Sequence, residues 1–303
     1  FLPHISPRTT RWNLLIEELI NQGNQVTVLT GTNPKDISKK YNILYFGNKD
    51  LSSAVNTLRI DSKNVNNSFL KKNLYKILKK VYRIIFKSIA WPDYAMFWIF
   101  TVIKNKSKIP KDFDIIISVS LPFTSHVCAS ILKKSMSSKW FMDIGDPFSL
   151  KDKSFENNRY LYSFFNFYCE KKYFRTADKV IFTHEEASEL HMKKFKIPKS
   201  KLVIGHPISI INPHFIDSSY KFRYINLPIK IGYFGIFTDG VRDPYNYLNT
   251  VASSLKDNIH HYWYIKDESI KYFSSFKNLN THVFKTMIPR EDALREMINN
   301  FHI

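Results

Sequence analysis

Apolar runs of strand length alternate with segments of helical periodicity along most of the chain. The runs are residues 26–31, 114–120, 139–145, 179–184, 201–205, 229–235, 261–266 and 281–285. Most are continuously apolar rather than alternating, which is typical of strands whose sheet is covered on both faces. Alternation of such strands with helices predicts the α/β class with parallel sheets.

A helix-to-strand unit opens the chain. Apolar residues between Trp12 and Ile20 recur at helical spacing, and Gly23 follows as a stop signal before the strand at 26–31. Towards the other end, a helix is expected near 269–276 and another is expected to open at Pro289.

The alternation lapses once, in a polar, Pro-containing stretch after His206. A chain of 303 residues also exceeds a usual single domain of ~100–200 residues. We therefore predict a first domain at 1–208, a linker at 209–228 and a second domain at 229–303. Each is expected to be Rossmann-like, with a doubly wound parallel sheet. Because the second domain has few strands and the first lacks an opening strand, we expect further sequence on both sides of this chain.

The chain is strongly basic, with 45 Lys and Arg against 26 Asp and Glu, for a net charge of +19. This charge favours an anionic partner such as nucleic acid, anionic lipid or a phosphorylated substrate. Cys128 and Cys169 lie far apart without metal-type spacing, which indicates a reducing, cytoplasmic compartment and no zinc site. The most apolar stretch, 84–103, is interrupted by Lys87, Pro92 and Asp93, so no transmembrane helix is expected.

Four sequence blocks occur in order along the chain. They are SPRTTRWNLLIEELINQGNQVTVLTG, DFDIIISVSLPFTSHVCASILKK with KWFMDIGDPF, ADKVIFTHEEASELHMKKFKIPKSKLVIGHP, and IKIGYFGIFTDGVRDPYNYL. Together they resemble the retaining GT-B glycosyltransferases of family four, of the bacterial surface-polysaccharide type. Asn24 and Gln25 replace the usual His-Glu pair, His206 stands where Asn is common, and the first loop lacks the glycine-rich form.

The resemblance implies two domains that face a cleft, the first binding an acceptor and the second a nucleotide-diphosphate-sugar. The implied reaction moves a sugar, with retention, to a polyprenol-linked or saccharide acceptor in capsule or O-antigen biosynthesis. Neither a cofactor nor a metal ion is implied, and the enzyme would lie peripherally on the inner face of the plasma membrane. The paired glutamates that grip the donor sugar in this family would follow Ile303, which leaves the activity of residues 1–303 open.

Candidate catalytic residues follow two of the predicted strands, where open α/β sheets bind their ligands. Asp143 and Asp146 lie in DIGDP, where an aspartate could orient the acceptor hydroxyl. The alternative is that one of them caps the next helix. His126 begins a helix after the strand at 114–120, where it could act as a donor or a base, or be purely structural.

Cationic residues that could bind the donor diphosphate occur in both domains. Arg242 follows Gly235 in a turn ahead of a helix, and a guanidinium suits bidentate phosphate recognition. The alternative for Arg242 is a surface salt bridge with a neighbouring aspartate. Arg8 and Arg11 flank the first helix N-terminus, which favours anions, or are simply solvated. By resemblance, Arg290 edges the nucleotide-base pocket, with solvation at a helix start as the alternative.

Residues 69–89 place apolar side chains on one helical arc and basic ones on the other, and Trp-rich sequence follows. Such a surface would be attracted to anionic lipid and would suit a membrane interface. The residues assigned to this membrane surface are Lys76, Lys79, Lys80, Arg83, Trp91 and Trp98. The alternative is a packed surface helix with a solvated basic face.

Two other classes of function compete. A nucleic-acid-binding protein would fit the charge of +19, but a recognisable nucleic-acid-binding motif is absent from the sequence and the α/β pattern argues against it, so no nucleic acid is expected. An inactive or epimerase-like GT-B protein would fit the four blocks equally well.

Overall fold

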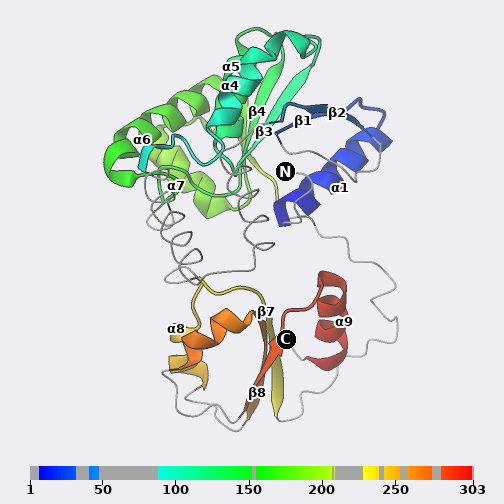
Figure 1. Cartoon of the computed structure of the whole chain (residues 1–303), viewed down its shortest axis with the longest axis vertical. Coiled ribbons are helices and arrows are strands. Elements are labelled where there is room, and N and C mark those ends of the chain that lie inside the picture. Colours follow the sequence, from blue (N-terminus) through cyan, green and yellow to red (C-terminus); the bar gives the residue numbers. More distant parts are fainter. Residues whose placement is uncertain are drawn as a thin grey trace, which may run out of the picture. The chain divides into compact units, whose positions relative to one another are not determined.

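The computed structural model describes residues 7–31, 41–47, 88–151, 155–206, 208, 228–238, 242–252, 258–274 and 281–301. The chain divides into two compact units, residues 1–208 and 209–303, each with its own parallel sheet (Figure 1). The division falls at the boundary placed on the sequence, whereas the roles assigned to the two domains stay predictions.

The first unit is built from five α-helices and six strands among its described residues. The helices are α1 (Pro7–Asn21), α4 (Phe97–Lys104), α5 (Thr124–Lys133), α6 (Arg159–Thr176) and α7 (Glu185–Phe195), with 3-10 turns η1 (Lys106–Lys108) and η2 (Lys199–Lys201). The strands are β1 (Thr27–Thr30), β2 (Asn42–Tyr45), β3 (Ile115–Val119), β4 (Lys139–Ile144), β5 (Lys179–Phe182) and β6 (Leu202–Ile204).

The main sheet of the first unit has the strand order β3-β4-β5-β6, and β1 pairs with β2 in a separate parallel ladder. All neighbours in the main sheet are parallel, with Val119 opposite Asp143 and Asp143 opposite Ile181. Since each strand joins the strand before it, right-handed crossovers place α5, α6 and α7 on one face.

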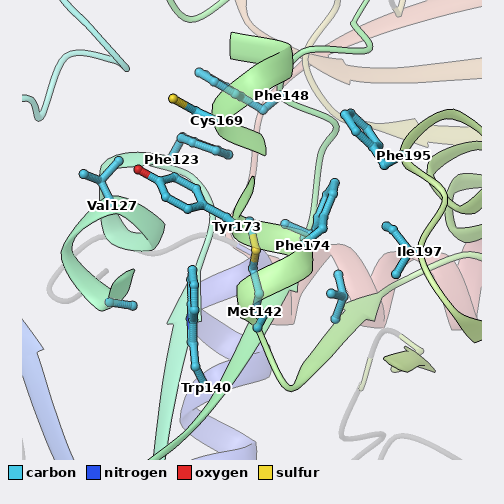
Figure 2. Close-up of a cluster of buried hydrophobic side chains, with 14 of the residues drawn as sticks. Phe123, Val127, Trp140, Met142, Phe148, Cys169, Tyr173, Phe174, Phe195 and Ile197 are labelled. Atoms are coloured by element: carbon cyan, nitrogen blue, oxygen red, sulfur yellow. The ribbon is translucent and has the colours of Figure 1, made fainter. Parts of the chain in front are cut away.

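The core of the first unit lies between that sheet face and the three crossover helices. Figure 2 shows this buried cluster, in which Trp140 and Met142 of β4 point toward Tyr173 and Phe174 of α6. These four side chains are at most 8% exposed. Burial of each large side chain contributes about 1.5–3 kcal/mol, so this layer dominates the stability of the unit.

Helix α1 covers the opposite face of β4. Trp140, Met142 and Ile144 alternate with Phe141 and Asp143 along this strand, and only the first three belong to the core cluster. Asp143 instead bonds to residues of α1. The sheet therefore has helices on both faces, as a doubly wound architecture requires.

The second unit repeats this architecture on a smaller scale. Its strands β7 (Ile229–Phe234), β8 (Ile259–Ile265) and β9 (His282–Thr286) form a parallel sheet in that order. One face packs against α8 (Tyr245–Tyr247) with the π-helix η4 (Leu248–Ala252), and against the 3-10 helix η5 (Asp267–Phe273). On the other face α9 (Arg290–Asn300) packs against β7, and Phe301 lies against Gly232, where a Cβ atom would come within 2.9 Å of its ring.

The α/β class, the parallel sheets and all eight strand positions predicted from the sequence are confirmed. Two helical details differ from expectation. The helix expected at 269–276 is the 3-10 helix η5, and Pro289 is the residue before α9 rather than its first residue. How the two units face one another, which defines the GT-B arrangement, stays a prediction.

Candidate functional site

In the first unit, two arginines of α1 meet two aspartates at the carboxyl end of β4. Arg8 and Arg11 are three residues apart and so share one helix face. Asp143 lies near the end of β4, and Asp146 lies in the loop that follows. Arg8 pairs with Asp146, and Arg11 pairs with Asp143.

Asp143 is part of a buried ion pair. Its carboxylate is fully buried and accepts two hydrogen bonds from Arg11 Nη1, both 3.2 Å long, and a third from Trp12 Nε1 at 2.7 Å. Both charges are removed from water, and three hydrogen bonds from two side chains compensate the carboxylate. This geometry fastens α1 to the sheet and leaves Asp143 no exposed oxygen for a substrate.

Asp146 keeps an accessible carboxylate. It pairs with Arg8 Nη2 at 2.9 Å, and its side chain is 50% exposed while that of Arg8 is 24% exposed. An exposed pair of this kind contributes little to stability, so both groups are available to a ligand. Of the two predicted acids, Asp146 is the one that a substrate hydroxyl could reach.

Two glycines make room for the arginines. A Cβ atom on Gly145 would lie 2.1 Å from Arg8 Nη2, and one on Gly205 would lie 2.7 Å from Arg11 Nη2. Any larger residue at either position would displace a guanidinium. The carboxyl ends of β4 and β6 are thus shaped around these two cations.

The loop after Asp146 is hydrogen-bonded to a buried glutamate. Glu170 of α6 accepts hydrogen bonds from the backbone N–H groups of Phe148 and Ser149 and from the Ser149 hydroxyl. Burial raises the pKa of Glu170 to about 7, although these hydrogen bonds work in the opposite direction. His191 Nε2 lies 4.0 Å from this carboxylate, and burial lowers the pKa of His191.

His126 lies in the core rather than at the surface. Trp140 Nε1 donates to Ser118 Oγ, which itself lies 2.8 Å from His126 Nδ1. His126 Nε2 is a buried atom without a partner among the described residues. Burial, with the charge of Arg8, lowers the pKa of His126 to about 3. His126 of α5 thus links this helix to Ser118 of β3. Its catalytic role stays a prediction.

The second unit contains a pocket of about 400 Å³ between the β7–β8 sheet face and α8. Its floor is aromatic: Tyr233 and Phe237 stack with ring centroids 4.8 Å apart, and Trp263 lies beside them. Tyr247 of α8 closes one side of the pocket. A mostly apolar pocket of this volume with a few polar groups is typical of a small-molecule site.

Arg242 lines this pocket. Its backbone exchanges two hydrogen bonds of 2.9 Å with Thr238, and its exposed side chain forms no ion pair with any residue that the structure describes. Gly235 ends β7 where a Cβ atom would lie 2.9 Å from the Tyr233 hydroxyl, so it lets that ring fold back toward the pocket. Arg290 is the first residue of α9, and its side chain is outside the described part of the chain.

Two imidazole rings and an indole ring contact one another at the pocket floor. The His261 and His282 centroids are 4.3 Å apart, and each lies 5.9 Å from the Trp263 centroid. His261 Nε2 is 2.7 Å from the Tyr247 hydroxyl, and Trp263 Nε1 donates to His282 Nδ1 at 3.0 Å. Burial lowers the pKa of His261 to about 4, with His282 and His260 contributing, so the ring is neutral near pH 7.

The residues predicted for a membrane surface are only partly described. Lys76, Lys79, Lys80 and Arg83 lie outside the described residues. Trp91 donates from Nε1 to Asn166 at 2.9 Å and contacts Phe165, and Trp98 lies against Gly31. Both indoles are half-buried contacts within the first unit, and their membrane role stays a prediction.

Several residues at the carboxyl end of β4 and at the pocket of the second unit were not singled out from the sequence. Trp12 and Gly205 are examples in the first unit, and Tyr247 and His261 in the second. The sequence carries no signal for which arginine pairs with which aspartate, because that pairing depends on how α1 packs on the sheet. It carries none for the contacts of His261 either, because histidine and tryptophan alternating on a strand are typical of any aromatic core.

Within the described ranges, no group of three or more His, Cys, Asp or Glu side chains could hold a metal ion. The helices in those same ranges include none that is long and apolar enough to cross a bilayer.

The comparison with solved structures finds likenesses to this chain. No protein-family model matches the chain, and no curated protein matches its sequence. Among solved structures, the chain resembles that of Arabidopsis thaliana UGT89C1 complexed with UDP-L-rhamnose, with 10% sequence identity and a TM-score of 0.41. The match covers 91% of this chain and 65% of that one.

Proposed function

We propose that the chain is part of a glycosyltransferase of GT-B type that binds a nucleotide-diphosphate-sugar in its second unit. The observation that carries the proposal is Arg242 on an aromatic pocket of about 400 Å³. A nucleoside matches the flat, apolar floor, and a guanidinium matches a diphosphate in charge and in bidentate geometry. Stabilising the charge on a departing diphosphate is the main requirement of this chemistry.

The acceptor is proposed to bind in the first unit, at the carboxyl end of β4. Asp146 is exposed there beside Arg8, and Glu170 holds the loop that follows. The Asp146 carboxylate would accept a hydrogen bond from the acceptor hydroxyl and orient it. Retention of configuration, a polyprenol-linked or saccharide acceptor and a role in surface-polysaccharide assembly at the cytoplasmic face of the membrane rest on the resemblance of the four sequence blocks.

Arg242→Ala tests the donor site. We expect nucleoside-diphosphate affinity to fall about tenfold or more, since a charge-assisted hydrogen bond contributes about 1.5–3 kcal/mol. Arg242→Lys should retain only part of the wild-type affinity, because an ammonium group cannot form the two parallel hydrogen bonds of a guanidinium. Isothermal titration with UDP, GDP, ADP and CDP measures the effect.

Arg295→Ala is the matched control for this titration. Arg295 is exposed on α9, on the opposite sheet face, and its removal also takes one positive charge from the second unit. Equal affinity in wild type and Arg242→Ala would remove Arg242 from the site. An equal loss in both alanine variants would show that only net charge matters.

A further inference from the structure

Helix α6 departs from the usual distribution of polar and apolar residues. Asn166 and Glu170 face the interior and are 6% and 0% exposed, whereas Tyr160 and Phe164 are 96% and 83% exposed. In a water-soluble helix the large apolar side chains normally face the core. Here the outward side of the first half of α6 is apolar as well.

The exposed apolar residues form one continuous surface, which we name the aromatic face. It consists of Tyr160, Leu161, Phe164, Phe165 and Tyr168 of α6, together with Ile89. The spacing of the five helical residues places them on one side of the helix. Ile89 lies beside them because its carbonyl accepts a 2.7 Å hydrogen bond from the Tyr162 hydroxyl and because Trp91, two residues on, contacts Phe165. Each of the six is at least 44% exposed.

Two exposed cations lie on the same side of α6 as the aromatic face. They are Lys172 and Arg175, and the single acid of this helix, Glu170, is buried. We propose that the aromatic face docks the chain on an anionic lipid bilayer. Tyr and Phe side chains would enter the interface while the two cations bind lipid head groups.

The same charges argue against a second copy of the chain as the occupant. A two-fold symmetric dimer would place the aromatic face against itself, and the cations of the two copies would then face one another. The docking proposal rests on the proposed function in one respect: a polyprenol-linked acceptor, which lies in the bilayer, gives the chain a reason to bind there. The aromatic face lies mainly on α6 and shares only Ile89 with residues 69–89.

The test is co-sedimentation with vesicles of phosphatidylcholine and phosphatidylglycerol in a two-to-one ratio, and with phosphatidylcholine alone. We expect the wild-type chain to bind the anionic vesicles, and Tyr160→Ser with Phe164→Ser to weaken binding at least tenfold, because two large side chains no longer enter the interface. Lys172→Gln and Arg175→Gln should together weaken binding to anionic vesicles, by about fivefold for each charge.

A control pair of substitutions tests whether vesicle binding depends on the aromatic face or on exposed apolar side chains in general. Tyr45→Ser with Ile270→Ser also removes two exposed apolar side chains, 45% exposed in each case, and should leave vesicle binding unchanged. The proposal is overturned if wild type ignores anionic vesicles, or if the Tyr160 and Phe164 pair binds as wild type does. It is equally overturned if sedimentation velocity shows a wild-type dimer that this pair abolishes without a change in vesicle binding. Nucleoside-diphosphate titration of the same variants reports the donor site separately.

Discussion

At the scale of single residues, two aspartates three positions apart have opposite environments. Asp143 is fully buried between Arg11 and Trp12, whereas the Asp146 side chain is half exposed beside Arg8. Removing one partner of a buried pair leaves an uncompensated charge, whereas an exposed pair is already screened by water. The same chemical change therefore has different consequences at the two positions.

Asp143→Asn should lower the free energy of unfolding by about 3–5 kcal/mol, because the Arg11 guanidinium would remain buried without its counter-charge. Asp146→Asn should change it by less than about 1 kcal/mol and instead reduce sugar transfer in the intact enzyme. Urea unfolding followed by circular dichroism measures the first effect, and a transfer assay the second. Similar destabilisation by both substitutions would contradict the assignment.

Residue identities alone were enough to select these acids, but not to separate their roles. Both aspartates follow a predicted strand, so both were placed at the ligand-binding edge. Burial of Asp143 depends on which face of β4 meets α1, and that follows from a packing between segments more than a hundred residues apart. His126 is similar, since its neighbours Ser118 and Trp140 come from two different strands.

At the scale of elements, strands were predicted more accurately than helices. Residues 229–235 gave β7 within one residue, because a continuous apolar run has few alternatives in a parallel sheet. The segment after β8 became a 3-10 helix, which hydrophobic periodicity does not distinguish from an α-helix over seven residues. The outward aromatic face of α6 is invisible to periodicity for a related reason, since apolar residues occur on both sides of that helix.

The end of α7 offers a stabilising substitution. Lys196 caps this helix in the left-handed conformation, with φ 55° and ψ 51°, where a Cβ atom is unfavourable. Lys196→Gly should raise the free energy of unfolding by about 1 kcal/mol, because glycine is the preferred residue at this position. Thermal unfolding measures the change, with Lys196→Ala, which keeps the Cβ atom, as the control. A lower melting temperature for the glycine variant would contradict this explanation.

At the scale of the whole molecule, buried titratable groups make stability depend on pH in two opposing ways. Glu170 has a folded-state pKa of about 7 against an ordinary value of 4.5, so the folded chain binds the extra proton between these values. Stability from this group is full below about pH 4.5 and is lost as pH rises toward 7. His126 and His261 have lowered pKa values, so their contribution is lost as pH falls below about 6.5.

Glu170→Gln isolates the first contribution. The difference in unfolding free energy between wild type and variant should shift in favour of the variant by on the order of 3 kcal/mol between pH 4.5 and pH 7. Urea unfolding at a series of pH values measures it, and the contributions of His126 and His261 cancel because both proteins contain them. A difference that is constant over this range would show that Glu170 does not titrate there.

The sequential strand order of both main sheets has a consequence for synthesis on the ribosome. In the first unit β3, β4, β5 and β6 begin at residues 115, 139, 179 and 202, and each new strand pairs with the one translated before it. At about 5–20 residues per second, seconds separate the emergence of successive strands, whereas a crossover helix forms in about a microsecond. Each strand can therefore dock on a partner that is already in place, so the sheet grows at one edge in the direction of translation.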